Sequence, residues 1–321
     1  MPIVSSTYNP SWIFKNGHIS TIYSAKIRPI PKLVQERERV NLWDGDFIDV
    51  DWSFSEKSTN KVAILLHGLE GNAQRTYIKS SGKFLIENQY DVAAVNYRGC
   101  SGELNESFQT YNAGKTDDLE AVINFILEKN KYDEIVLIGF SLGGNLLLKY
   151  LGERDVLPKQ VKKGISISSP LSLKGSLIAL QKPENWVYST SFLLDMRKKY
   201  KTKMEHFPDK MNKETLKKIK SLLDFDNLYT APAHGFKDAE DYYAKNSCLQ
   251  FLPNIKVPVY LLNAKNDSFL SSDCYPYELA KNSKTLFLET PEYGGHVGYH
   301  LTNSNYYSEK RTLDFLNDSF I

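Results

Sequence analysis

The residue whose sequence setting points most clearly to chemistry is Ser141. It is the centre of the run Gly-Phe-Ser-Leu-Gly at residues 139–143, which follows an apolar stretch and precedes a helical pattern. This arrangement is typical of a nucleophile elbow, a sharp strand-to-helix turn that raises a hydroxyl above a sheet at a helix N-terminus. Small residues two positions before and after the serine avoid clashes with the adjoining strand and helix. We therefore predict that Ser141 is a nucleophile, against the alternative of a glycine-rich turn without a function.

A serine nucleophile also needs an acid and a base in the right order along the chain. Its hydroxyl is weakly nucleophilic, so it requires a base that is itself oriented by a third group. After a nucleophile elbow, the expected order is serine, acid, histidine. Asp267 follows the apolar run 259–262, and His296 lies among glycines after a further apolar run. This order predicts Asp267 as the acid and His296 as the base.

Other residues of the same types remain alternatives. His300 lies four residues beyond His296 but has no flanking glycines, and Asp273 could take the place of Asp267. Three more histidines precede the acid in the sequence, an order that the motif does not favour: His18, His206 and His234. For every one of these candidates, the alternative interpretation is an ordinary loop carboxylate or a histidine satisfied by its neighbours.

Two backbone N–H groups are predicted to face the oxyanion that forms when a serine attacks a carbonyl. One belongs to Leu142, directly after the nucleophile, and the other to Leu69 in the run His-Gly-Leu-Glu-Gly at residues 67–71. His67 itself is predicted to be a buried turn histidine. Cys100, in the next glycine-rich loop, has no base partner in the sequence and is predicted to pack. Neither loop is a phosphate loop, because no Gly-Lys-Ser/Thr follows.

The elements that bring these loops together are predicted from the periodicity of apolar residues. The expected strands are 62–66, 92–96, 135–138 and 165–168, and the expected helices between them are 76–88, 116–130 and 145–151. Strand character returns at 257–262 and 285–288, and a last helix is expected at about 306–320. Strands that alternate with helices predict right-handed βαβ units and a parallel sheet covered on both faces. The predicted fold class is therefore α/β.

The segments outside this alternation have other expected structures. Residues 1–32 contain four prolines and are expected to be irregular, whereas residues 34–52 should form an antiparallel hairpin around Asp44-Gly45. We predict one domain over residues 1–321, with approximately 171–250 as an inserted helical cap. Open α/β sheets place their ligands at the carboxyl edge of the sheet, so we expect the cap there.

Composition excludes several classes of protein. The chain has 321 residues, 41% of them hydrophobic, which excludes a disordered chain. Forty Lys or Arg against 38 Asp or Glu give a net charge of +2, which predicts no nucleic-acid partner. Cys100, Cys248 and Cys274 lack metal-ligand spacing, so we expect reduced thiols in a cytoplasmic protein with no metal and no cofactor. We recognise no signal peptide, and no apolar run approaches the roughly 20 residues of a membrane-spanning helix.

The balanced total conceals a basic segment in the predicted cap. Residues 196–220 contain ten Lys or Arg and three Asp or Glu. Such a run is either a solvated helix face or a surface for peripheral contact with anionic lipid headgroups, worth about 1 kcal/mol per residue near a charged membrane. Both interpretations stay open at this point.

Several stretches together resemble the α/β-hydrolase superfamily. More narrowly, they resemble its YheT-like branch, which includes plant embryogenesis-associated proteins and eukaryotic membrane-anchored lipases and esterases. The stretches that carry the resemblance are Asn9–Trp12, Asn16–His18, Thr21–Tyr23, His67–Gly71, Tyr97–Gly102, Gly139–Gly144 and Gly294–His296. The chain departs from the branch at Asn266, where a second Asp is common. That departure bears on how the neighbouring Asp267 is held.

The resemblance implies an α/β-hydrolase fold and a serine esterase. Ser141 would form an acyl-enzyme, with Asp267 as the acid and His296 as the base, on short- or medium-chain or lipid-like esters. Transfer of the acyl group to an alcohol is an alternative, and a binding protein without catalysis is another. Apolar residues of the cap would either line an acyl tunnel or pack the cap onto the sheet: Leu177, Leu180, Trp186, Phe192 and Leu193.

Overall fold

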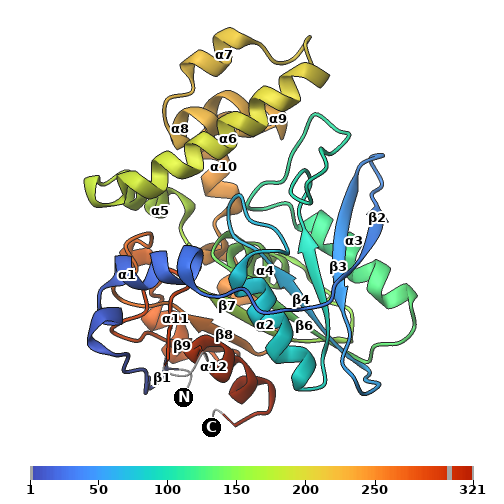
Figure 1. Cartoon of the computed structure of the whole chain (residues 1–321), viewed down its shortest axis with the longest axis vertical. Coiled ribbons are helices and arrows are strands. Elements are labelled where there is room, and N and C mark those ends of the chain that lie inside the picture. The colour runs from blue at the N-terminus through green and yellow to red at the C-terminus, as the bar shows by residue number, and fades with distance from the viewer. Residues whose placement is uncertain (1–2, 302–305, 320–321) are drawn as a thin grey trace.

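Within residues 3–301 and 306–319, which this computed structural model describes, nine strands form one central sheet (Figure 1). Their order across the sheet is β1-β9-β8-β7-β6-β4-β5-β3-β2. The strands are β1 (Ile3–Val4), β2 (Glu36–Asn41), β3 (Phe47–Ser53), β4 (Lys61–Leu66), β5 (Asp91–Asn96), β6 (Glu134–Phe140), β7 (Val161–Ile167), β8 (Val259–Leu262) and β9 (Leu286–Glu289). Neighbours from β1 to β5 in this order run parallel, whereas β3 pairs antiparallel with both β5 and β2. The predicted fold class, a mostly parallel sheet with an antiparallel hairpin, is confirmed.

Helices cover both faces of this sheet because its central strands are apolar on both sides. Ile64 and Leu66 of β4 belong to the core beneath α3 (Thr116–Glu128), α4 (Leu142–Glu153) and α11 (Tyr277–Asn282). Ala63 and Leu65 of the same strand belong to the core beneath α2 (Thr76–Glu87) and α12 (Tyr307–Leu316). Alternate side chains of a strand point to opposite faces, so a continuous apolar run contributes side chains to the buried core on both faces of the sheet. The predicted last helix is α12, and Phe320, at the end of its expected range, lies outside the described residues.

The N-terminal segment is more ordered than its prolines suggest, so the prediction of an irregular stretch is wrong here. It contains the 3₁₀ turn η1 (Trp12–Lys15), the helix α1 (Gly17–Ile22) and the wide helical turn η2 (Tyr23–Ile27), and β1 pairs with β9 at the edge of the sheet. Asn16 caps α1, because its side chain accepts a hydrogen bond from the N–H of Ile19 at 3.0 Å. Pro10, Pro29 and Pro31 lie between these elements rather than inside them.

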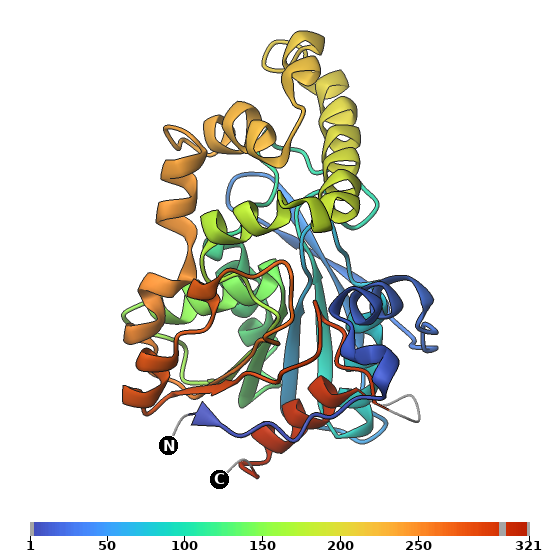
Figure 2. The same ribbon diagram turned by 90° about the vertical axis from the view of Figure 1, so that its left-hand side faces the viewer.

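Helices fill the chain between β7 and β8 and stand above the sheet in Figures 1 and 2. They are α5 (Leu173–Leu180), α6 (Trp186–His206), α7 (Lys213–Lys218), α8 (Leu222–Phe225), α9 (Ala231–Ala233) and α10 (Ala239–Asn246). The chain returns to the sheet through the 3₁₀ segment η5 (Cys248–Asn254). Across the described ranges, we find no helix with the length and apolar character needed to cross a bilayer.

Candidate active site

Ser141 occupies the turn between β6 and α4 with a backbone that L-residues rarely adopt. Its φ is 54° and its ψ is −122°, and its N–H donates to the carbonyl of Ile167 at 2.9 Å. The glycines two positions before and after Ser141 are required because there is no room for a side chain at either position. A Cβ at Gly139 would overlap the backbone of Gly143, and a Cβ at Gly143 would overlap the carbonyl oxygen of Leu66. The residues of the motif thus fold into the sharp turn that their types predict.

His296 and Asp267 form a continuous hydrogen-bond series with Ser141. The Nε2 of His296 lies 2.9 Å from the Oγ of Ser141, and its Nδ1 lies 2.8 Å from the Oδ2 of Asp267. The other carboxylate oxygen accepts the N–H of Phe269 at 2.9 Å, and the Phe269 ring stacks on the imidazole with centroids 4.3 Å apart. The Asp267 side chain is fully buried and that of His296 is 11% exposed. This geometry can carry a proton from the hydroxyl to an imidazole whose tautomer is fixed by a carboxylate.

The loop that carries His296 is held by the N-terminal segment and by Asn266. The backbone N–H of His296 donates to the Oγ1 of Thr21 in α1 at 2.8 Å. The N–H of Gly295 donates to the Oδ1 of Asn266 at 2.9 Å, and the Nδ2 of Asn266 donates to the carbonyl of Lys15 at 2.9 Å. Asn266, which departs from the family pattern, therefore connects the acid loop, the base loop and η1. Thr21 begins one of the stretches that carry the family resemblance, but nothing in the sequence indicated that it would hold the base loop.

The two predicted oxyanion donors lie on loops that flank Ser141. A Cβ on Gly68 would lie 3.0 Å from the Cβ of Ser141, so the loop after β4 approaches the serine closely. The N–H of Gly68 donates to the hydroxyl of Tyr77 at 3.0 Å. Within the described part of the chain, the N–H groups of Leu69 and Leu142 donate to no protein acceptor. Both remain available to a developing oxyanion.

A partly buried polar cluster that sequence reasoning missed holds the loop after β4. Glu70 has a positive φ of 52°, its N–H donates to the hydroxyl of Tyr111 at 2.8 Å, and that hydroxyl donates to its Oε1 at 2.7 Å. The Nζ of Lys199 in α6 lies 2.9 Å from the same Oε1. Arg75 donates to the carbonyl of Glu70 at 2.6 Å. The loop of the predicted oxyanion donor is thereby tied to the long helix α6.

The alternative histidines and the alternative acid lie in other surroundings. His300 stacks on Phe14 with centroids 4.1 Å apart, and Asp273 is exposed in the turn after Leu270. The Nδ1 of His18 lies 3.1 Å from the hydroxyl of Tyr188. His234 lies after α9, where burial lowers its pKa to about 3, and His206 is exposed at the end of α6. None of these described residues contacts Ser141.

His67 and Cys100 are buried as predicted, but the Nζ of Lys199 also donates to the Cys100 sulfur at 3.4 Å, a partner that the sequence did not indicate. His67 is fully buried, its Nδ1 lies 2.7 Å from the carbonyl oxygen of Gly68, and burial lowers its pKa to about 3. Burial also raises the pKa of the Cys100 thiol to about 11. All three cysteines are free and buried, and the described residues contain no group of three or more side chains that could hold a metal ion.

A cavity of about 120 Å³ opens beside Ser141 and His296 and is lined largely by residues of the helices between β7 and β8. Leu177, Leu180 and Phe192, which were predicted either to line a tunnel or to pack, all line it, whereas Trp186 is mostly exposed. One carboxyl group also lines it. Asp226 accepts a hydrogen bond from the hydroxyl of Tyr243 at 2.6 Å, and burial raises its pKa to about 6.

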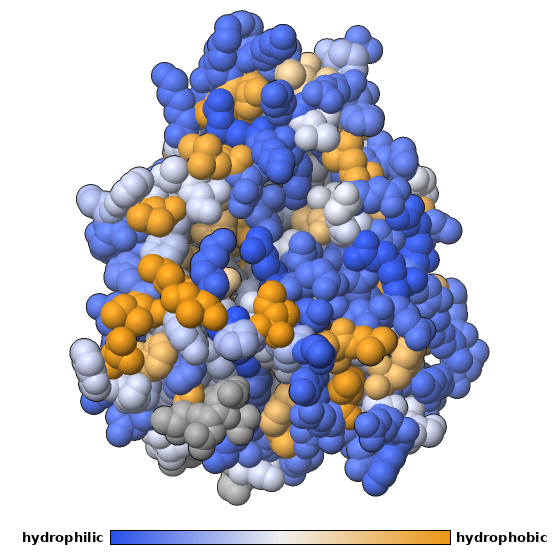
Figure 3. Space-filling model, viewed as in Figure 1, coloured by the Kyte–Doolittle hydropathy of each residue, from blue (hydrophilic) through white to orange (hydrophobic). Residues whose placement is uncertain are grey.

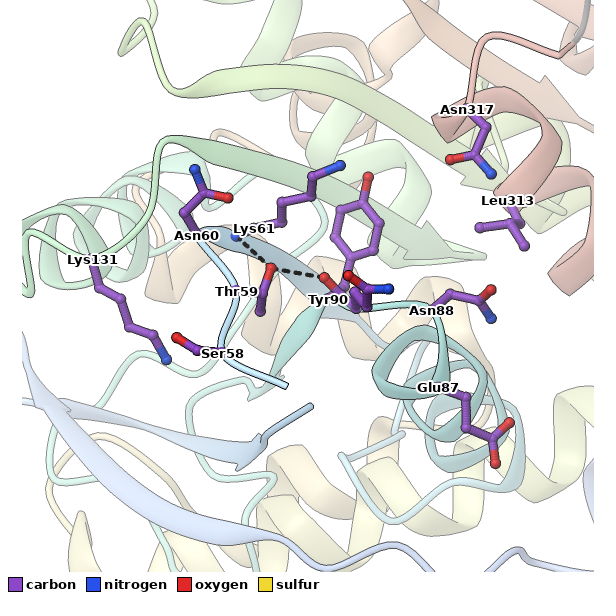
Figure 4. A pocket seen from close by; sticks show the side chains of 11 residues that line it. Ser58, Thr59, Asn60, Lys61, Glu87, Asn88, Tyr90, Lys131, Leu313 and Asn317 are labelled. Carbon is purple, nitrogen blue, oxygen red and sulfur yellow. Dashed lines mark hydrogen bonds between the residues drawn. The ribbon is translucent and has the colours of Figure 1, made fainter. Parts of the chain in front are cut away.

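A larger hollow of about 720 Å³ lies at the opposite end of the sheet. Figure 4 shows polar side chains around it, among them Asn60 and Lys61 at the start of β4, Tyr90 before β5, and Lys131. The hydroxyl of Thr59 accepts the N–H of Lys61 at 3.1 Å and donates across the hollow to the carbonyl of Gln89 at 2.8 Å. It contains no nucleophile with a base beside it, so its size does not make it the better candidate site.

Comparison with known proteins identifies the family of the chain. A family model described as alpha/beta hydrolase fold matches residues 62–301. The YheT protein of Escherichia coli (strain K12) is 28% identical over 97% of this chain and 93% of its own length. The phospholipase ABHD3 of Bos taurus is 30% identical over 93% of this chain and 74% of its own length. The solved structure of the Pyrococcus furiosus esterase Pf2001 covers 91% of this chain and 98% of that one with a TM-score of 0.60, and its 17% identity bears on the fold alone.

The chain belongs to the α/β-hydrolase fold family, because the family model spans most of it and a relative at 30% identity covers nearly all of it. The predicted resemblance to the YheT-like branch is confirmed in the same way. The curated relatives YheT and ABHD3 also support the predicted class of carboxylic ester hydrolase.

Proposed function

We propose that this chain hydrolyses lipid-like carboxylic esters with a short acyl group, through an acyl-enzyme on Ser141. The observation that carries the proposal is the unbroken hydrogen-bond series from the Ser141 hydroxyl through His296 to the buried Asp267 carboxylate. The catalytic roles of these three residues are part of the proposal.

In the acylation step, His296 takes the proton of Ser141 while the serine oxygen attacks the ester carbonyl. The N–H groups of Leu69 and Leu142 stabilise the negative charge on the carbonyl oxygen, and Asp267 stabilises the imidazolium and its orientation. When the tetrahedral intermediate collapses, His296 gives its proton to the leaving alcohol. The acyl group then remains on Ser141.

In the deacylation step, a water molecule takes the place of the alcohol. His296 removes a proton from the water, which attacks the acyl-enzyme, and the same two N–H groups stabilise the second tetrahedral intermediate. Collapse returns the proton to the serine oxygen and releases the carboxylic acid. Every proton that moves is accounted for by His296, so no metal or cofactor enters the proposed sequence.

The cavity beside Ser141 supports a short acyl group and gives the predicted cap a function. Its volume of about 120 Å³ is well below the roughly 300–1,000 Å³ of pockets that hold drug-sized ligands. Leu177, Leu180 and Phe192 would contact the acyl chain. We therefore propose that residues 171–250 act as a cap that limits acyl length. The phospholipase relative supports a lipid-like alcohol as the other half of the ester.

Turnover of a series of p-nitrophenyl esters, from acetate to palmitate, tests the proposal. We expect wild-type rates to fall steeply beyond the short acyl chains, and Ser141→Ala to lower kcat by at least about 10⁴-fold. Ser58→Ala, at the rim of the larger hollow, is the matched control and should retain wild-type turnover.

Two further results decide the chemistry. A fluorophosphonate probe should label the wild type and not Ser141→Ala. Product analysis with added glycerol distinguishes hydrolysis, which releases the free acid, from acyl transfer, which yields a glycerol ester. Wild-type turnover by Ser141→Ala would overturn the proposed nucleophile.

A further inference from the structure

The N-terminal segment exposes large apolar side chains on one face of the molecule. Trp12 is 82% exposed although tryptophan is usually among the more buried residues. We define the N-terminal apolar strip as the exposed side chains Trp12, Ile13, Ile19, Ile22, Ile27 and Ile30. Figure 3 shows hydrophobic side chains gathered over α1 on this face. Exposed apolar patches of this kind mark interaction sites in soluble proteins.

The charge of the same segment has one sign. Residues 1–35 contain Lys15, Lys26, Arg28 and Lys32 and no Asp or Glu. Arg28 is paired with Glu309 at 2.8 Å, whereas the three lysines are exposed beside the strip. Apolar side chains interleaved with lysines complement a surface that is apolar inside and anionic at its headgroups.

A second exposed apolar strip continues the first one. It consists of Ile178 in α5 and of Trp186 and Val187 at the start of α6, and Trp186 is 64% exposed. His18 of α1 and Tyr188 of α6 connect the two strips. Their rings stack nearly parallel, and the Nδ1 of His18 lies 3.1 Å from the hydroxyl oxygen of Tyr188. Figures 1 and 2 both show α1 next to the start of α6.

Both strips lie directly outside the candidate active site. The helix α1 exposes Ile19 and Ile22 and, on its buried side, holds the His296 loop through Thr21. On the α6 side, Tyr188 packs against Phe269 with centroids 4.8 Å apart, and Phe269 stacks on His296. The exposed apolar surface is thus continuous with the walls of the site.

We propose that the two strips form one docking face for an anionic lipid surface. Tryptophans are favoured at membrane interfaces, where an apolar ring with a polar N–H fits the headgroup level. Lysines without a neighbouring acid favour anionic lipid over a neutral surface. Docked in this way, the face would hold the opening of the site against the lipid that contains its substrate. This inference goes beyond the proposed function, because it names a partner that binds whether or not Ser141 is the nucleophile.

This placement differs from the basic segment 196–220 that the sequence suggested. Two of its lysines are not at the surface. Lys199 pairs with Glu70, and the buried Lys203 donates to the carbonyl of Ser107. The exposed lysines of α7, among them Lys217 and Lys218, remain a competing lipid surface that an experiment can separate from the docking face.

Vesicle binding tests the proposal with the inactive Ser141→Ala protein, so its failure is distinct from failure of the proposed function. Vesicles of equimolar phosphatidylcholine and phosphatidylserine should bind the protein, and vesicles of phosphatidylcholine alone should bind it less. The double variant Trp12→Ser/Ile22→Ser should lower the partition coefficient by about tenfold or more. Lys15→Gln and Lys26→Gln should each lower it about fivefold.

Matched variants make the result decisive. Val156→Ser, at an equally exposed valine after α4, should leave binding unchanged. If Lys217→Gln/Lys218→Gln abolishes binding while the strip variants do not, the lipid surface lies on α7 and the proposal is wrong. Absence of binding to either vesicle by the Ser141→Ala protein with both strips intact would also overturn it and would favour a protein partner for the face.

Tryptophan fluorescence provides a second measurement, and it requires only the conservative substitution of tryptophan by phenylalanine. Brominated phosphatidylcholine in the anionic vesicles should quench the protein, and Trp12→Phe and Trp186→Phe should each remove part of that quenching. Trp43, which is 61% exposed in the turn between β2 and β3, is the control, and Trp43→Phe should leave the quenched fraction unchanged. Quenching that depends on Trp43 instead would contradict the proposed face.

Discussion

Ser141 and His296 meet at 2.9 Å, but they are held in place in different ways. The position of Ser141 is local, because the end of β6, the start of α4 and the glycines at 139 and 143 are contiguous in sequence. The position of His296 depends on distant segments, since its N–H bonds to Thr21 and its loop bonds to Asn266. The proposed nucleophile is positioned by steric constraints and the proposed base by long-range hydrogen bonds, so we expect mutations on the two sides to have effects of different size.

The largest loss of stability and activity is expected from a substitution in the tightly packed turn that holds Ser141. In Gly143→Ala the new methyl group would overlap the carbonyl oxygen of Leu66, and a strand backbone cannot move aside. We expect the free energy of unfolding to fall by about 3 kcal/mol, and kcat by about 100-fold in the protein that folds. Urea unfolding and ester turnover measure the two effects. Gly82→Ala is the control, because the only close contact of its methyl group, at 3.0 Å, would be with the end of the Leu33 side chain.

A smaller loss of activity is expected from a substitution that weakens the hydrogen bonds of the His296 loop. Thr21→Val keeps the shape of the side chain but removes the oxygen that accepts the N–H of His296. An unpaired buried N–H costs about 1–3 kcal/mol, so we expect kcat to fall about tenfold with KM nearly constant. Thr21→Ser should restore most of the activity. Wild-type kcat in Thr21→Val would show that the base does not depend on the N-terminal segment, and the comparison would fail.

The same contrast explains what could be predicted from the sequence. The strands, the elbow and the order of Ser141, Asp267 and His296 follow from patterns that span a few residues, and the structure brings these side chains together. The role of Thr21 could not be found in this way, because its partner lies 275 positions away along the chain. The prolines of residues 1–32 indicated irregular structure, although the Asn16 cap and distant hydrogen bonds stabilise the helical turns of residues 12–27.

The charge of the segment 196–220 shows a second limit of sequence patterns. A run of lysines indicates an exposed helix face, yet Lys199 turns inward and pairs with Glu70 beside Leu69. Nothing in the spacing of the lysines distinguishes this one, because its partner is supplied by the loop after β4. Periodicity reports which residues share a face, and only the fold decides what that face meets.

Lys199 provides a test of a contact that belongs neither to the Ser141 turn nor to the His296 loop, because it holds the loop of the predicted oxyanion donor Leu69. Lys199→Met removes the cation that holds Glu70, while the Tyr111 hydroxyl still binds the same carboxylate. We expect kcat to fall about threefold and KM to change less, because the loop would orient the Leu69 N–H less firmly toward an oxyanion. Lys201→Met, at an exposed neighbour on α6, should have no effect. An equal loss in both variants would mean that the charge of α6 matters rather than this contact.

The smallest expected effect is one of pH, at a residue that contacts neither Ser141 nor His296. Burial raises the pKa of Asp226 from its usual 3.8 to about 6, so folding disfavours the ionised carboxylate. Its contribution to stability is therefore present below pH 3.8 and is lost as the pH rises through about 6. Asp226→Asn removes that loss, and the gain in unfolding free energy should be about 1 kcal/mol larger at pH 8 than at pH 5. Urea unfolding at the two pH values measures it, with Asp273→Asn at an exposed carboxylate as the control. A gain that does not change with pH would mean that the Asp226 carboxyl is solvated in the cavity, and the cavity would then be more polar than its leucines and phenylalanine suggest.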